Sequence, residues 1–140
     1  MASHLRRIVT ERAWHRCEYC GLAQAGQEAA FHIDHVVPVI AGGPTDEDNL
    51  ALACVSCSLR KGARQSAADP DSGRDEPLFN PRRDTWPEHF RWAGTAMVGL
   101  TATGRATVVA LRVNRPLSLA IREEETLRGR HPLSAGRKGR

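Results

Sequence analysis

Apolar residues recur every three to four positions near the start of the chain, with polar residues between them. This spacing predicts an amphipathic helix over residues 4–15, with Ser3 as its N-cap. The side chains expected to share its apolar face are Leu5, Ile8, Val9 and Trp14. We expect this helix to pack against the rest of the fold.

The pattern then changes to short runs of apolar and β-branched residues. Residues 30–39 predict a strand. Thr45, followed by acidic residues, is typical of a helix N-terminus. Residues 49–53 predict either a second strand or the end of that turn, and residues 58–62 predict the start of a helix.

The second half of the chain is less regular. Residues 65–77 are rich in Asp, Ser, Pro and Gly, which favours a linker between a module at residues 1–64 and an extension at residues 78–129. The tail at residues 130–140 is basic and expected to be disordered. Within the extension we expect a strand at 95–101 and helices at 103–113 and 116–128.

Charge is distributed unevenly. The net charge is +4 and the pI is about 9.2. Arg and Lys balance Asp and Glu over residues 1–64, with seven of each, whereas residues 65–140 carry thirteen against nine. A basic excess fits a polyanionic partner without requiring one. No signal peptide or membrane-length apolar run is present, so we expect a cytoplasmic protein with no membrane partner.

Aromatic residues and cations gather in the extension, where Phe79, Trp86, Phe90 and Trp92 alternate with arginines. Such a run can stack on nucleic acid. It can equally pack the extension onto the module while the arginines stay in water, and we favour packing.

All four cysteines lie in two Cys-x-x-Cys pairs, Cys17/Cys20 and Cys54/Cys57. Four thiolates match a tetrahedral structural zinc site, which leaves no open coordination position. A pair of redox motifs is the alternative, but the βαβ context of a thioredoxin-like motif is absent. The pattern therefore predicts bound Zn²⁺ that stabilises a module with a modest core.

Between the cysteine pairs, two histidines and an aspartate occupy four residues, His32-Ile33-Asp34-His35. In a strand, His32 and Asp34 share one face and His35 points to the other. A carboxylate oxygen suits Mg²⁺ or Mn²⁺, and a neutral imidazole suits a base that takes a proton from water. This division predicts Asp34 as a metal ligand and His35 as a general base.

Taken in order, these motifs resemble the HNH endonuclease family. The residues that carry the resemblance are Cys17-x-x-Cys20-Gly21, His32-x-Asp34-His35-Val36-x-Pro38, Gly42-Gly43, Asp48-Asn49-Leu50, Cys54-x-x-Cys57 and Lys61-Gly62. The resemblance covers about residues 14–64 and implies an α+β protein. The implied protein contains a small ββα-metal module stapled by a four-cysteine zinc site. An N-terminal helix precedes this module, and a mixed α/β extension follows it.

The resemblance also implies individual roles. Asn49 would orient His35 through a hydrogen bond and stabilise the loop between the strands. The family usually places His or Asn, a second metal ligand, directly after the last cysteine, where this chain has Ser58. Ser58 would then ligate directly or through water, His32 would substitute for it, or the metal would bind weakly.

The implied activity is metal-dependent hydrolysis of phosphodiester bonds in DNA, with Mg²⁺ or Mn²⁺ in the catalytic site. We expect Lys61, Arg60 and Arg64 to contact nucleic acid. Because of Ser58, the alternative is a zinc-binding nucleic-acid module with weak or no catalysis. The sequence does not define the oligomeric state.

Overall fold

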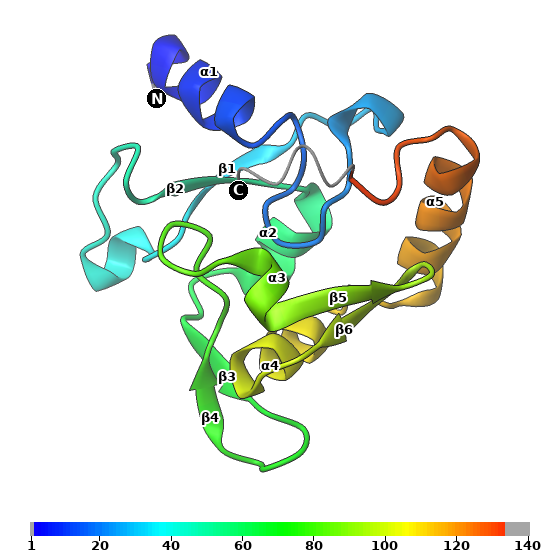
Figure 1. The fold of residues 1–140 in the computed structure, drawn as a ribbon. Coiled ribbons are helices and arrows are strands. Elements are labelled where there is room, and N and C mark those ends of the chain that lie inside the picture. The colour runs from blue at the N-terminus through cyan, green and yellow to red at the C-terminus, as the bar shows by residue number, and fades with distance from the viewer. Residues whose placement is uncertain (1, 134–140) are drawn as a thin grey trace.

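A computed structural model describes residues 2–133 and shows an α+β fold (Figure 1). Within these residues the strands pair into three separate antiparallel sheets of two strands each. The elements in chain order are α1 (Ser3–Arg12), η1 (Gln24–Gly26), β1 (His32–His35), η2 (Val39–Ala41), β2 (Leu50–Ala53), α2 (Val55–Lys61), β3 (Ser66–Ala68), β4 (Asp75–Pro77), α3 (Trp86–His89), β5 (Phe90–Ala93), β6 (Ala96–Gly99), α4 (Ala102–Ala110) and α5 (Pro116–Leu127).

The expected ββα unit is formed by β1, β2 and α2. His32 pairs with Ala53 and His35 with Leu50, and every residue of β2 is buried. The strand predicted over residues 30–39 is shorter than expected, because the chain turns into η2 soon after His35. Residues 49–53 do supply the second strand.

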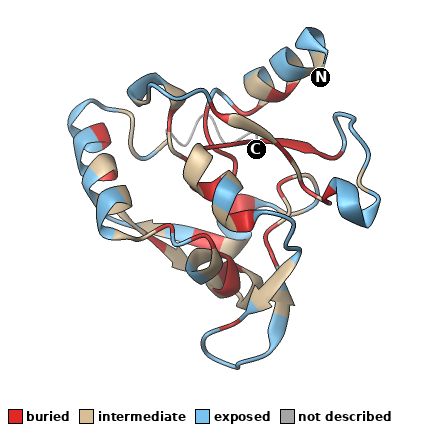
Figure 2. Ribbon diagram, turned by 180° about the vertical axis from the view of Figure 1, so that it is seen from behind, coloured by how far each residue is buried: buried red, intermediate tan, exposed pale blue. Residues whose placement is uncertain are grey.

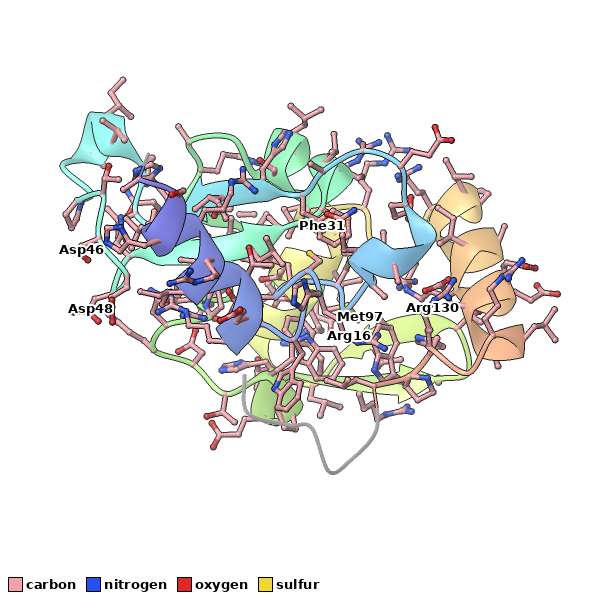
Figure 3. All side chains as sticks on the ribbon, turned by 90° about the horizontal axis from the view of Figure 1, so that it is seen from above. Arg16, Phe31, Asp46, Asp48, Met97 and Arg130 are labelled. Atoms are coloured by element: carbon pink, nitrogen blue, oxygen red, sulfur yellow. The ribbon has the colours of Figure 1, made fainter. Side chains whose placement is uncertain are left out.

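Helix α1 packs on β2 and crosses above the strand pair in Figure 3. Its predicted cap is wrong, because Ala2 holds the N-cap position and Ser3 is the first helical residue, with no side-chain cap bond. Trp14 lies beyond the helix at a φ of 57° and is 46% exposed, so it is not part of the buried face. Val9 is the fully buried residue of the helix.

The helix expected to begin at Thr45 is a turn instead. Asp46 supplies hydrogen bonds within that turn, its Oδ1 accepting from the Asp48 backbone N–H at 3.0 Å and its carbonyl from the Asn49 N–H at 3.0 Å. Asp residues favour such local bonds over helix continuation. The turn leaves the Thr45 side chain free to reach β1.

Residues 65–77, expected to be a linker, contain the β3–β4 hairpin, which projects from the end of the molecule opposite α1 (Figure 1). Asp69, the residue directly after β3, is 1% exposed. Arg105 of α4 donates to both of its carboxylate oxygens at 2.9 Å. These charge-assisted bonds hold the hairpin on α4, and composition alone did not indicate them.

One hydrophobic core continues from the ββα unit into the extension, and the buried residues run from β2 through the centre of the molecule to α4 (Figure 2). The Trp86 indole N–H donates to the Tyr19 carbonyl at 3.0 Å. Phe79 meets Tyr19 edge-on, with ring centroids 6.4 Å apart, and Phe90 at 5.2 Å. The aromatic residues of the extension therefore pack it onto the module, the reading favoured from sequence.

Helix α5 and the residues after it lie against the β5–β6 pair. The Arg122 guanidinium stands 5.2 Å from the centre of the Trp92 ring. Arg130 forms an ion pair with Glu125 at 2.7 Å, and His131 packs edge-on to Trp92. Of the tail predicted to be disordered, these first residues are held by contacts, and residues 134–140 lie outside the described part of the chain.

None of the helices among residues 2–133 combines the length and apolar character needed to cross a membrane.

Candidate functional site

The two cysteine pairs meet at the base of the ββα unit. Their four Sγ atoms all lie within 4.8 Å of one another, and all four side chains are buried. This cluster confirms that Cys17, Cys20, Cys54 and Cys57 form a group able to bind a metal such as zinc.

In both knuckles a backbone N–H group points at a cysteine sulfur. The N–H of Cys20 points at Cys17 Sγ and the N–H of Cys57 at Cys54 Sγ, each at 3.4 Å. Gly21 takes a φ of 76°, which an L side chain rarely adopts. Hydrogen bonds from the other thiols, chiefly Cys17, lower the pKa of the Cys20 thiol well below its ordinary value, and hydrogen bonds within the same cluster raise the pKa of Cys54 and Cys57. A thiolate is the form that binds metal.

An open cleft of about 560 Å³ lies beside β1. Its walls come from α1, β1, the turn that contains η2, and the end of α2. The lining residues are Arg6, His32, Ile33, Asp34, His35, Pro38, Val39, Ile40, Ser58, Gly62 and Ala63. The cleft therefore brings together four of the residues expected to be functional.

Asp34 is largely buried and has two partners. The Tyr19 hydroxyl donates to its Oδ2 at 2.7 Å, and the Lys61 ammonium lies 3.2 Å from Oδ2 and 3.4 Å from Oδ1. Burial raises the pKa of Asp34, while the positive charge of Lys61 opposes the rise. Burial also raises the pKa of Tyr19 well above its ordinary value, and the Asp34 charge adds to the effect. Tyr19 thus remains a hydrogen-bond donor.

Lys61 is only 2% exposed. Besides the pair with Asp34, its ammonium donates to the His35 carbonyl at 3.0 Å. In this structure α2 points the Lys61 side chain into the protein, and its expected phosphate contact stays a prediction. Lys61 instead fixes Asp34 and the end of β1.

His35 lies at the end of β1, half-buried, and its Nε2 is 2.8 Å from Thr45 Oγ1. The expected hydrogen bond from Asn49 to His35 is not formed. Asn49 Nδ2 donates to the carbonyls of Val37 and Pro44, and its Oδ1 accepts from the Val37 N–H. Asn49 therefore stabilises the loop between the strands, as expected, while Thr45 contacts the imidazole.

The same loop explains Gly43. A Cβ atom at this position would lie 1.7 Å from the Val37 carbonyl oxygen and 2.8 Å from Asn49 Nδ2. Only glycine allows the backbone this close approach, so the loop that carries Thr45 depends on it.

His32 and Ser58 are direct neighbours, with Nδ1 and Oγ 2.9 Å apart. Ser58 is the fourth residue of α2, and His32 is the first residue of β1. The structure thus places both alternatives for the second metal ligand side by side at the cleft that Asp34 also lines.

Arg60 and Arg64 lie outside this cleft. The Arg60 Nε donates to Ser56 Oγ at 3.3 Å, and Arg64 donates to the carbonyls of Arg60 and Ala110. Arg64 is exposed and Arg60 is half-buried. Their contact with nucleic acid stays a prediction.

Three residues of this site were missed from the sequence. Tyr19 binds Asp34, Thr45 contacts His35, and Arg6 lines the cleft from α1. The only sequence signal for Tyr19 was its position inside a cysteine knuckle, and Thr45 was misassigned as a helix cap. Arg6 lies before the motif-bearing segment and gave no signal.

Residues 17–64 match the model of the family described as HNH endonuclease. The chain is also similar to the Septu protein PtuB of Bacillus thuringiensis, with 23% identity over 114 residues, which make up 80% of this chain and 42% of that protein. The chain thus spans less than half the length of this curated relative. No solved structure matches the chain.

Proposed function

We propose, from the match of residues 17–64 to the HNH endonuclease family, that this protein is a metal-dependent endonuclease that hydrolyses phosphodiester bonds in DNA. The observation that carries the proposal is the cleft beside β1, which is lined by His32, Asp34, His35 and Ser58. A structural zinc in that cluster would hold β1, β2 and α2 in the register that forms the cleft.

His35 is the proposed general base. In the neutral tautomer whose Nε2 donates a hydrogen to Thr45 Oγ1, Nδ1 carries no hydrogen and can accept a proton from water. Asn49 and Gly43 act indirectly, because they fix the loop that carries Thr45.

A divalent metal would be held by Asp34 together with His32 or Ser58. The Asp34 oxygens retain lone pairs beyond those that meet Tyr19 and Lys61, so the donor set fits a cation. Carboxylate and hydroxyl oxygens suit Mg²⁺ or Mn²⁺. An imidazole nitrogen as a further ligand would favour Mn²⁺, the transition metal of the two. When bound, such a cation would neutralise charge on the phosphate oxygens.

A plasmid-nicking assay with Mn²⁺ and with Mg²⁺ tests the proposal. We expect the wild-type protein to nick and relax supercoiled DNA. His35→Ala should lower the rate about 10²–10⁴-fold, the usual contribution of a general base.

The matched control is His4→Ala, because His4 is exposed on α1 and does not line the cleft. It should cut like wild type, and both variants should keep the zinc content and thermal unfolding midpoint of wild type. Equal cutting by His35→Ala and wild type would refute the mechanism. Salt-sensitive binding of DNA without cutting by the wild-type protein would instead support the catalytically weak or inactive zinc-binding module.

A further inference from the structure

We infer that Arg6 of α1 binds a backbone phosphate of the nucleic-acid strand held in the cleft, so that the N-terminal helix forms part of the substrate site. Arg6 lies before residues 17–64 and outside the family match. The inference rests on the proposed function for the identity of the ligand.

The charges around the cleft single out Arg6. Among the described residues that line the cleft, the acidic residue is Asp34, and its charge faces the buried Lys61 ammonium at 3.2 Å. Among these lining residues, Arg6 is the side chain with a permanent positive charge. In the part of the chain that the structure describes, Arg6 forms no ion pair with a carboxylate. The cleft therefore presents one uncompensated cation to its contents.

The Arg6 side chain is exposed, and its hydrogen bond to the backbone is weak. One guanidinium nitrogen, Nη1, donates to the Phe31 carbonyl at 3.4 Å, the long end of the hydrogen-bond range. A guanidinium has five N–H donors in a planar fork that matches a phosphate. Most of these donors thus remain available at the cleft wall, and the bond to Phe31 directs the group toward β1.

The other cations expected to bind nucleic acid are placed differently. Lys61 is buried, and Arg60 and Arg64 do not line the cleft. Nearby acidic residues do not oppose Arg6 inside the cleft, because Asp46 and Asp48 lie on the exposed outer loop (Figure 3). Arg6 is therefore the arginine or lysine that can hold a phosphate in the same cleft as His35.

The test uses the full chain and two variants, Arg6→Gln and Arg7→Gln. Glutamine keeps a donor for the Phe31 carbonyl and removes the charge. Arg7 is a neighbouring exposed arginine of α1 that does not line the cleft, so its variant controls for the loss of one surface charge. Binding of a fluorescein-labelled DNA duplex is measured against salt concentration in the His35→Ala background without added divalent metal. Nicking is measured in the wild-type background.

We expect Arg6→Gln to weaken binding about tenfold or more, and to reduce the slope of log affinity against log salt by about 0.9, the loss of one phosphate contact. Nicking should fall through a higher KM, and Arg6→Lys should restore the salt slope. Arg7→Gln should change the slope by much less. Equal effects of Arg6→Gln and Arg7→Gln would overturn the inference.

The two proposals fail in different ways. If the wild-type protein does not nick but Arg6→Gln still lowers the salt slope, the nuclease assignment fails and the phosphate contact stands. If the wild-type protein nicks and Arg6→Gln leaves binding and nicking unchanged, only the inference about Arg6 fails. Absence of DNA binding by the wild-type chain would overturn both.

Discussion

Asp34 and Lys61 form the buried ion pair on which the candidate site depends. Lys61 is 2% exposed and Asp34 is 8% exposed, and both also bind neighbouring groups, Tyr19 and the His35 carbonyl. Taking two charges out of water costs several kcal/mol for each ion, which only a well-bonded pair offsets. The pair therefore adds little to the free energy of unfolding. Removing one partner alone should nevertheless lower that free energy strongly, because the other charge stays buried without a counter-ion.

Lys61→Met should consequently destabilise the fold by about 3–5 kcal/mol, because it leaves the Asp34 carboxylate buried without a cation. Urea unfolding followed by circular dichroism measures the change. Adding Asp34→Asn to the same chain should recover part of the loss, because the uncompensated charge is then absent.

Arg60→Met is the matched control, from the adjacent position of α2. Its side chain makes one long bond to Ser56, so its removal should change stability by less than about 1 kcal/mol. A Lys61→Met protein as stable as wild type but with weaker DNA affinity would instead return Lys61 to the surface role expected from the sequence.

Residue identities were easier to predict than residue directions. The cysteine spacing predicted the metal-binding cluster. His32, Asp34 and His35 all line one cleft, although the strand pattern predicted that His35 points to the face opposite Asp34. The sequence could not show that Lys61 points inward, because a lysine on a short helix is equally compatible with solvent. The sequence also could not show that the Asn49 side-chain amide donates hydrogen bonds to loop carbonyls, because these bonds depend on the path of the backbone in the turn after Thr45.

At the scale of elements, the ββα unit has little secondary structure to hold it together. Its strands have four residues each and its helix has seven. Isolated helices of this length are marginal in water, and a two-stranded hairpin is marginal too. The first knuckle precedes β1 and the second spans the junction of β2 and α2, so a metal bound there would tie the start of the unit to that junction.

We expect one zinc per chain in the purified protein and near-complete loss of the native fold when it is removed. Structural zinc contributes roughly 10–16 kcal/mol in finger peptides, which matches or exceeds the roughly 5–15 kcal/mol that keeps a domain folded. Elemental analysis gives the stoichiometry. Thermal unfolding before and after treatment with a strong chelator gives the loss.

Cys57→Ser should reproduce the chelated state without any reagent, whereas Ser56→Ala, one position earlier on α2, should retain zinc. A metal-free protein with an unchanged unfolding midpoint would show that the cysteine cluster does not hold the fold together.

The short elements of the second half were only partly predictable. The helices expected at 103–113 and 116–128 correspond to α4 and α5, because Thr101 caps the first and Pro116 begins the second. The β3–β4 hairpin was not predicted, since its strands have three residues each and depend on the Asp69–Arg105 contact. Local pattern cannot reveal an element that a distant side chain stabilises.

For the whole molecule, the main difference from the sequence interpretation is the continuous core. The boundary expected after residue 64 is crossed by the Trp86 bond to Tyr19, the edge-on contact between Phe79 and Tyr19, and the ion pair of Arg82 with Glu18. Glu18 is buried, and burial raises the pKa of its carboxyl group, an effect that Arg82 opposes. Residues 1–64 therefore lack part of their own interior.

A fragment of residues 1–64 should accordingly fail to unfold cooperatively, even with zinc present. It would expose Tyr19 and leave Glu18 without its cation. Urea titration of the fragment against the full chain tests this, with tryptophan emission and circular dichroism as coincident probes. A sharp two-state transition in the fragment would show that the segment matching the family is an independent domain.

The Trp86–Trp92 contact gives the molecule an internal optical reporter. The two indole ring centroids lie 5.2 Å apart and the ring planes are tilted by 33°, close enough for their excited states to couple. Trp14, in contrast, is 46% exposed. Light absorbed in the near ultraviolet therefore carries two separable signals. One is a coupled signal from the packed extension, and the other is the emission of the exposed Trp14 just after α1. Because Trp86 is bonded to the carbonyl of Tyr19, which lies between the first two cysteines, loss of metal at the knuckles should reach the coupled pair and become visible without any added label.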